Sequence, residues 1–583
     1  MRLPNLTVMS RDVAGQDCRP FVPYQTIDAF DIKGSRRYAG QYSDLYFLRL
    51  ARLKSSVEEK AHRDWDSLEI AGEQARSVER VLDVRQGELV WVAGTIFADL
   101  PLKPNILEEI SHNHWNEVPP ARAKYKSPNG VDVMMLEDES GRLRLSGKIF
   151  STLGLVTGCV VAVLGTENRE GEFETIDLRV PDLAPQLPRW SFGGRPTPEQ
   201  ADVKRRRINP ESGKQTPLVA IVSGLGIQGE TGSGLMIDLL ESYLLGELAH
   251  HRHTSKRICR LLLVGNSIDT TSTSTYVLDP LEKDLDGMPR KKQKATVARK
   301  YGYDSSAYNP LPTAELDSLL YALLPSIPIT ILPGVTDPSN HSLPQQPLHP
   351  ALFARSRQWG PDKQPAKAPE PPADYDGGPP SGREYSASLH STTNPASFSL
   401  NGFSFLAMAS QTVDDVLKYI DLPSSSTRHR LDQPSDHVEQ SDADPDSPNS
   451  PTEATAKDRL VVMERMLRWR CIAPTAPDTL PCYPYQDIDP FVIERSPHVL
   501  ISGGGAQYGS TVIQARPDDY LQEDTIMQET NVNGEEQEEI NIRLITVPDF
   551  RLTGVVALCD IETLECSRIV LGAWNESHEG VPP

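Results

Sequence analysis

Apolar residues recur along the first third of the chain with two different spacings. Residues 42–80 carry them at intervals of three and four, which predicts helices over DLYFLRLARLKSSVEEKA and DSLEIAGEQARSVERVL. Residues 88–183 carry them in short runs between turn residues, which predicts about five strands. Five short strands within about 100 residues favour a small barrel, for which the OB-fold is the natural candidate.

The spacing changes at Pro217, where apolar residues become continuous. Three compact runs follow, PLVAIVSGLG, CRLLLVGNS and IPITILPGVTDP, with helical patterns between them. Such runs are typical of buried parallel or mixed strands in an α/β layer. Later strand candidates are GFSFLAMAS, PHVLISGGG, IRLITVPDF and VVALCDI. The predicted fold class is therefore α/β plus a β-barrel.

Three polar segments interrupt the second pattern. They are rich in proline and glycine or in acidic residues, and they bury too little apolar surface to offset the entropy of ordering. We therefore predict disordered insertions near residues 357–385, 422–457 and 516–540. The predicted domain order is a lead-in at 1–40, a helical segment and OB-fold at 41–190, a linker at 191–216 and the α/β domain at 217–575.

The chain is acidic, with 59 Lys and Arg against 80 Asp and Glu and a formal net charge of −21. Such a surface repels a nucleic-acid backbone, so contact with DNA requires a local basic patch or a partner protein. Two short basic runs, VKRRR at 203–207 and PRKKQK at 289–294, are equally consistent with nuclear localisation signals and with solvated loops.

The seven cysteines are dispersed along the chain and form no CxxC pair. This spacing argues against a disulfide framework or a zinc ribbon and favours a reducing compartment. No apolar run approaches the roughly 18 residues of a membrane span, and the N-terminal residues lack the core of a signal peptide. We therefore expect an intracellular protein without a membrane segment.

A glycine-rich loop follows the apolar run at Leu218. Gly224, Gly226 and Gly229 have the GxGxxG spacing of a dinucleotide site, and Gly234 completes the spacing of a P-loop. A P-loop requires Lys and then Ser or Thr after its last glycine, where this chain has leucine and methionine. The acidic residue that would hold a ribose about 20 residues further on is also missing. Nucleotide binding is therefore disfavoured.

The ends of the apolar runs resemble those of calcineurin-type metallophosphoesterases from which the chemistry has been removed. That superfamily builds a two-metal site at strand ends from the patterns DxH, GD, GNH[DE] and GHxH. The resemblance implies degenerate metal-site positions at Gly224, Gly226, Asn266, Val335, Thr336, Asp337, Gly504 and Ala506. Only Asp337 and Asn266 retain ligand atoms, and two such groups cannot hold a pair of divalent cations. We therefore expect no catalytic residue, no metal and no cofactor.

Longer segments carry a second resemblance. Five of these segments together resemble the second (B) subunits of DNA polymerase delta. They are RPFVPYQTID, GTENREGEFETIDLRVPDLAPQ, PITILPGVTDPSNHSLPQQPLHPALF, TAPDTLPCYP and LITVPDF. The resemblance implies an OB domain packed with an inactive phosphoesterase-like domain, in a nuclear, non-catalytic subunit for DNA replication and repair. The implied partners are the C-terminal metal-binding region of the catalytic subunit and the third subunit, with DNA contacted only indirectly through the complex.

Two other functions remain as alternatives. The first is an active metal-dependent phosphodiesterase or exonuclease like the working members of the superfamily. The second is an OB-fold protein that binds single-stranded DNA, for which strand faces with aromatic and cationic residues are expected. The predicted hairpin at 131–148 contains no aromatic residue and presents Glu137, Asp138 and Glu139, which disfavours this alternative.

Overall fold

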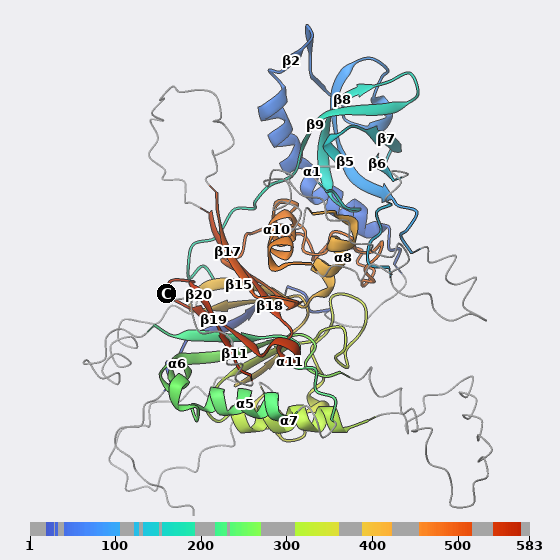
Figure 1. Ribbon diagram of the computed structural model, residues 1–583. Coiled ribbons are helices and arrows are strands. Elements are labelled where there is room, and N and C mark those ends of the chain that lie inside the picture. The colour runs from blue at the N-terminus through green and yellow to red at the C-terminus, as the bar shows by residue number, and fades with distance from the viewer. Residues whose placement is uncertain are drawn as a thin grey trace, which may run out of the picture.

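The chain is arranged in stacked layers (Figure 1). The structure is a computed structural model. It describes residues 19–27, 29–32, 40–104, 122–127, 132–150, 154–192, 216–229, 234–269, 309–360, 388–422, 454–515 and 540–572. The first domain is a helix packed on a ring of strands, and the second contains two stacked sheets between helices.

The strands of the first domain pair in a ring. They are β4 (Arg76–Ser77), β5 (Leu89–Asp99), β6 (Val133–Glu137), β7 (Arg142–Ser146), β8 (Val160–Glu167) and β9 (Glu172–Arg179). The sheet order is β4-β5-β6-β7-β9-β8, and β5 also pairs with β8. This is possible because β5 is long: Leu89–Thr95 pair with β8, and Thr95–Asp99 pair with β6.

The helix α1 (Asp44–Trp65) covers the outside of this ring. Its buried residues include Leu53, Val57 and Trp65, which share a cluster with Trp91 and Leu164 of β5 and β8. Residues of β5 alternate between this cluster and the interior of the ring, as expected of a strand whose successive side chains point to opposite faces. The helix predicted over residues 44–61 is thus confirmed.

The helix predicted over residues 66–82 is wrong. This segment contains β2 (Glu69–Ile70), β3 (Glu73–Gln74), β4 and the short 3-10 helix η1 (Val81–Asp83). Ala71 and Gly72 have φ values of 56° and 87° and form the turn between β2 and β3. A right-handed helix cannot continue through left-handed residues, so the apolar spacing there does not produce one.

The second domain contains two six-stranded sheets. The first sheet has the order β13 (Leu389–Ser391), β12 (Ile329–Leu332), β11 (Ile258–Val264), β10 (Leu218–Val222), β19 (Val555–Asp560) and β20 (Cys566–Val570). The second sheet has the order β1 (Tyr24–Ile27), β14 (Ala396–Leu400), β15 (Phe403–Met408), β16 (Val499–Gly505), β18 (Ile540–Pro548) and β17 (Gly509–Ala515). A shared core of residues such as Ile221, Leu262, Phe405 and Ile545 joins their facing sides.

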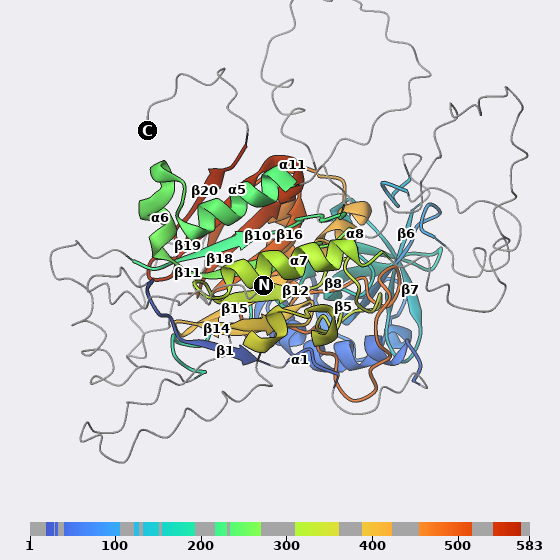
Figure 2. The same cartoon turned by 90° about the horizontal axis from the view of Figure 1, so that it is seen from below.

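Helices cover the outer faces of both sheets. The helices α5 (Gly234–Leu245) and α7 (Leu311–Leu323) lie across the first sheet, with α6 (Arg252–Arg257) beside them (Figure 2). The helices α8 (Gln411–Tyr419) and α10 (Ala456–Arg468) cover the second sheet and lie between it and the first domain (Figure 1). The other short helices in the described part of the chain are η2 (Ala249–His251), η5 (Pro350–Leu352), η6 (Ser356–Trp359) and α11 (Phe550–Thr553).

The predicted lead-in contributes a strand to the second domain. The strand β1 pairs antiparallel with β14, and Tyr24 lies opposite Leu400. The insertion predicted near 422–457 ends earlier than expected, because Thr455 caps α10 through a capping box with Asp458. The rest of that insertion lies outside the described residues, as do most of the other two insertions, most of the linker at 191–216 and both basic runs.

The two domains share one buried junction. Arg49 of α1 is fully buried, and its Nε donates to Asp489 Oδ2 at 2.8 Å. Its terminal nitrogens donate to the carbonyl oxygens of Pro474 and Ala476 at 2.7 and 3.1 Å. One apolar cluster also extends without interruption from the ring of strands to α8 and α10. The first domain is therefore fixed to the second.

His498, just before β16, makes stability depend on pH. Its buried ring accepts a hydrogen bond at Nδ1 from the Ser404 N–H at 3.0 Å, which requires a neutral Nδ1. Burial and, to a smaller extent, Arg189 lower the pKa of His498 to about 4.

We expect the His498→Asn variant to lose part of this pH dependence. The wild type loses stability as the pH falls below about 6.5 toward about 4, because only the unfolded chain takes up the proton there. An asparagine oxygen preserves the acceptor but cannot titrate. Urea unfolding measures the free energy of unfolding at about pH 7.5 and about pH 5. The decrease between these two pH values should be smaller in the variant by about 1–2 kcal/mol. Equal drops in both proteins would contradict the assignment.

Candidate functional site

The strand ends named by the phosphoesterase resemblance meet at one edge of the two sheets. Gly224, after β10, donates its N–H to the Gly265 oxygen at 3.1 Å, and Gly226 donates to the Asn266 oxygen at 3.0 Å. Gly265 in turn donates to Leu332, at the end of β12. The N–H of Gly504, in β16 of the second sheet, donates to Ser223 Oγ at 2.9 Å. The structure therefore brings these glycine loops together.

Val335, Thr336 and Ala506 are at the margin of this edge. Thr336 Oγ1 lies 3.5 Å from Asn266 Oδ1, while the side chain of Val335 is 53% exposed. Ala506 follows the end of β16 and is exposed. None of these three side chains carries a carboxylate or an imidazole, the usual ligands of a two-metal phosphoesterase centre.

The carboxylate of Asp337 is buried and binds backbone N–H groups. Its Oδ1 accepts from Ile268 at 2.8 Å, and its Oδ2 accepts from Gly334 at 2.8 Å. Burial raises the pKa of Asp337 to about 6, although the surrounding N–H donors act in the opposite direction. Asp337 thus ties the loop after β12 to the loop after β11, and both of its oxygens are engaged in that contact.

We expect Asp337→Asn to cost about 1–3 kcal/mol of stability, because its amide NH₂ would face a backbone N–H donor. The same substitution should remove a pH-dependent contribution. The unfolded carboxyl ionises near its ordinary value of 3.8 and the folded one near 6, so this contribution is lost as the pH rises through that interval. Urea unfolding at about pH 4 and about pH 7 measures both effects. A variant with wild-type stability and an unchanged pH profile would refute them.

The Asn266 amide fills the space beside the loop after β12. Asn266 has a left-handed φ of 53°, and its Oδ1 lies 3.4 Å from the N–H of Thr336. A Cβ atom added at Gly334 would lie 2.3 Å from this Oδ1. The two positions are therefore packed against each other, and they leave no room for a ligand side chain at Gly334.

Asp549, at the end of β18, belongs to the same edge although no motif in the sequence pointed to it. The backbone after β18 crosses the loop of β10: Phe550 donates to the Ser223 oxygen at 2.7 Å, and Arg551 donates to the Gly224 oxygen at 3.0 Å. A Cβ atom added at Gly224 would lie only 2.0 Å from Asp549 Oδ1. The Asp549 carboxylate therefore occupies the space that a side chain at Gly224 would need.

A buried guanidinium also lies at this edge. Arg459 of α10 is 3% exposed, donates to the Gly503 oxygen at 3.1 Å and forms an ion pair with Asp414. Burial is the main cause of a raised pKa at Asp549, Asp414 adds to it, and Arg459 opposes it. A guanidinium keeps its proton at all ordinary pH values, so Arg459 supplies no metal ligand at this end of β16.

The described residues offer little chemistry at this edge. Ser223 Oγ donates to the Val264 oxygen at 2.6 Å and accepts from Gly504, so its hydroxyl is engaged by backbone. Within the described part of the chain, no three His, Cys, Asp or Glu side chains are grouped so as to hold a metal ion. The edge is organised by backbone contacts, by the Asp337 carboxylate and by Arg459.

The acidic residues of the β6–β7 hairpin also have structural contacts. Glu137 pairs with Arg142 at 2.5 Å. Asp138 caps the turn and accepts from the backbone of Val81 at 2.8 Å and of Ser140 at 2.7 Å. These contacts show that the two carboxylates stabilise the hairpin turn. A surface that binds single-stranded DNA carries basic and aromatic side chains instead.

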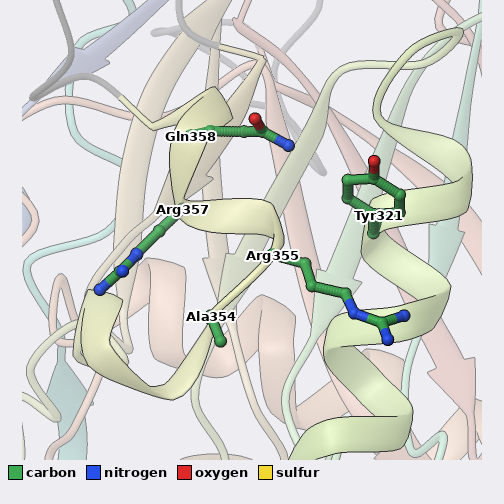
Figure 3. Close-up of a pocket in the computed structure, with 5 residues that line it drawn as sticks. All are labelled: Tyr321, Ala354, Arg355, Arg357 and Gln358. Atoms are coloured by element: carbon green, nitrogen blue, oxygen red, sulfur yellow. The ribbon is translucent and has the colours of Figure 1, made fainter.

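A separate open pocket of about 460 Å³ lies on the outer layer of the second domain (Figure 3). It is lined by Tyr321 of α7 and by Ala354, Arg355, Arg357 and Gln358 around η6. The two arginine side chains point away from each other (Figure 3). They do not converge on a common point in the pocket, so they form no joint site for an anion.

Comparison with known proteins is consistent with this arrangement of domains. Residues 41–178 match the family model for the DNA polymerase delta subunit OB-fold domain, and residues 219–510 match the model for the B subunit of DNA polymerases alpha and epsilon. The first match confirms the predicted OB-fold domain. Together the two matches define the class of protein as a B subunit of the replicative DNA polymerases.

Relatives that match along most of their length narrow this class of B subunits to that of one polymerase, DNA polymerase delta. The chain is 30% identical over 536 residues to the DNA polymerase delta small subunit of Saccharomyces cerevisiae, covering 92% of this chain and 90% of that protein. It is 29% identical to the small subunit of Oryza sativa subsp. japonica, over 94% and 96% of the two chains. It is 26% identical to DNA polymerase delta subunit 2 of Drosophila melanogaster, over 93% and 95%. The chain belongs to the family of DNA polymerase delta small subunits.

One further expectation from the sequence concerns membranes. Among the helices that the structure describes, none is long and apolar enough to span a bilayer.

Proposed function

We propose that this chain is a non-catalytic accessory subunit of DNA polymerase delta. Its OB domain and its inactive, calcineurin-like phosphoesterase domain form one rigid body that holds two partners. These are the C-terminal metal-binding region of the catalytic subunit and the third subunit. The chain acts in the nucleus during DNA replication and repair, and it contacts DNA only through the complex.

The main support for this proposal is the edge of the two sheets where the glycine loops meet. In an active phosphoesterase such strand ends present ligands to two cations. Here Gly224 is covered by Asp549, Asp337 binds backbone, and the Arg459 guanidinium lies beside Gly503. Family membership supports the same interpretation, because the relatives are named as small subunits of a polymerase.

The junction between the domains supports a role in assembly. Gly40 lies against Pro484 and Gln486, so the start of α1 and the 483–488 loop lie side by side. Both expose large apolar side chains: Phe47 is 52% exposed and Ile488 is 69% exposed. Exposed apolar side chains on two neighbouring segments suit a protein-binding surface.

The test of assembly is co-purification of the tagged full chain from cells, followed by mass spectrometry. We expect the polymerase catalytic subunit and the third subunit in the eluate. Phe47→Glu and Ile488→Glu should reduce their recovery at least threefold, because a charge placed in an apolar contact is costly. Leu552→Glu is the matched control, since Leu552 is 81% exposed and lies away from the junction. Failure of the wild-type chain to recover a catalytic subunit would refute the proposal.

The two alternatives are separated by assays on the purified chain. An active phosphodiesterase would show manganese-dependent turnover that disappears in Asp337→Ala, whereas we expect none. A single-strand-binding protein would bind oligonucleotides without partners and lose affinity steeply with salt. We expect no such binding at physiological salt, given the net charge of −21.

A further inference from the structure

Two cysteines face each other across the β19–β20 hairpin at the edge of the first sheet. Cys559 of β19 lies directly opposite Cys566 of β20 in the antiparallel register. Asp560 donates to the Glu565 oxygen at 2.8 Å, so that neighbouring pair is hydrogen-bonded, and the cysteines form the next, non-hydrogen-bonded pair. Cα atoms at such positions are about 4.5 Å apart, within the range of about 4.4–6.8 Å found in disulfides.

We propose that Cys559 and Cys566 form a reversible redox-modification site whose substrate is a peroxide. Both are free thiols, as are the four other cysteines that the structure describes. They differ from those four in having a cysteine directly opposite, and Cys566 lies on the edge strand β20, whereas Cys559 is buried on the neighbouring strand β19. Cys566 is partly exposed, whereas Cys159, Cys259, Cys471 and Cys482 are buried.

The surroundings give the two thiols different roles. The Cys566 sulfur lies beside the Cys559 thiol and the Ser510 hydroxyl of β17, and Arg543 of β18 places a positive charge nearby. These contacts lower the pKa of Cys566, against the effects of burial and of Glu565. The pKa of Cys559 is raised, first by its contact with Cys566 and then by burial. Cys566 is partly exposed and Cys559 is buried, so a peroxide reaches Cys566 first. Its exposure and its lowered pKa together make Cys566 the attacking thiolate and Cys559 the resolving thiol.

The reaction balances with one peroxide molecule. The Cys566 thiolate attacks a peroxide oxygen, the O–O bond breaks, and Cys566 becomes a sulfenic acid while the first water leaves after protonation. The Cys559 thiol then loses its proton, and its sulfur attacks the Cys566 sulfur. The S–S bond forms and the hydroxyl leaves as the second water. Two thiols are oxidised by two electrons and one peroxide is reduced to two waters.

The test treats the full chain with a small excess of hydrogen peroxide and maps its peptides under non-reducing conditions after alkylation. We expect a Cys559–Cys566 linked peptide, the loss of two alkylatable thiols, and full recovery of both with dithiothreitol. In Cys559→Ala the sulfenic acid of Cys566 should persist and react with dimedone. In Cys566→Ser the Cys559 thiol should stay reduced. Cys259→Ser is the matched control, because Cys259 packs in the same core cluster and should leave the disulfide unchanged.

Two outcomes would overturn the proposal. One is oxidation of Cys566 to sulfinic or sulfonic acid without any linked peptide, which means that the sulfurs do not meet. The other is alkylation or oxidation of Cys159, Cys259, Cys471 and Cys482 at the rate of Cys566, which means that the position on the edge strand confers no selectivity. Both readouts come from the wild-type chain, so they do not depend on whether a variant folds or on which proteins the chain binds.

Discussion

Replacing Arg49 with methionine is expected to lower the free energy of unfolding by about 3–5 kcal/mol, because it leaves a buried carboxylate without its partner. The side chains of Arg49 and Asp489 are 0% and 1% exposed. The guanidinium also supplies donors to the Pro474 and Ala476 oxygens, which methionine cannot replace. Urea unfolding of the full chain, followed by fluorescence, measures the loss.

The matched control lies one turn away on the same helix. Arg52 pairs with Glu494, but the two side chains are 62% and 54% exposed. Arg52→Met should therefore cost less than about 1 kcal/mol. In Arg49→Met/Asp489→Leu the unpaired charge is removed, and part of the stability should return. Equal losses for Arg49→Met and Arg52→Met would show that the junction does not depend on a buried ion pair.

The sequence predicts most of the interior strands but misses the edge strands and the interior strand β14. The runs that became β10, β11, β12, β16 and β18 are almost continuously apolar, which is the pattern of an interior strand. The edge strands β1, β17 and β20 were not predicted. They are short or carry exposed polar residues, and their conformation is fixed by a neighbouring strand.

The candidate site shows the same division. Gly224, Asn266, Asp337 and Gly504 were named through the resemblance of their strand ends to metallophosphoesterase motifs, and all four lie at or just after predicted apolar strands. Asp549 also follows such a run, in LITVPDF, so extending the search to the end of every predicted strand would have found it. Arg459 lies on a helix, and its contact with Gly503 arises only from the packing of α10 on the second sheet. No local pattern in the sequence indicates that contact.

Gly224→Ala is expected to cost about 2–5 kcal/mol, from two sources that can be measured separately. Gly224 has a left-handed φ of 63°, which costs an alanine about 1–2 kcal/mol. The new methyl group would also lie 2.0 Å from Asp549 Oδ1 and 2.9 Å from Asp549 Cβ, and overpacking of this kind costs about 1–3 kcal/mol. The measurement is again urea unfolding of the full chain.

The steric part of this cost depends on Asp549, so a double-mutant cycle isolates it. Among the described residues Asp549 Oδ1 has no hydrogen-bond partner, and the side chain does not cap α11, so Asp549→Gly alone removes no stabilising side-chain bond. In the Asp549→Gly background, Gly224→Ala should cost only the backbone part, about 1–2 kcal/mol. Gly572→Ala, where no described atom lies within 4 Å, should change little. If Gly224→Ala were harmless with Asp549 present, the loop after β10 would have room for a metal-binding side chain, and the phosphodiesterase alternative would regain its main structural requirement.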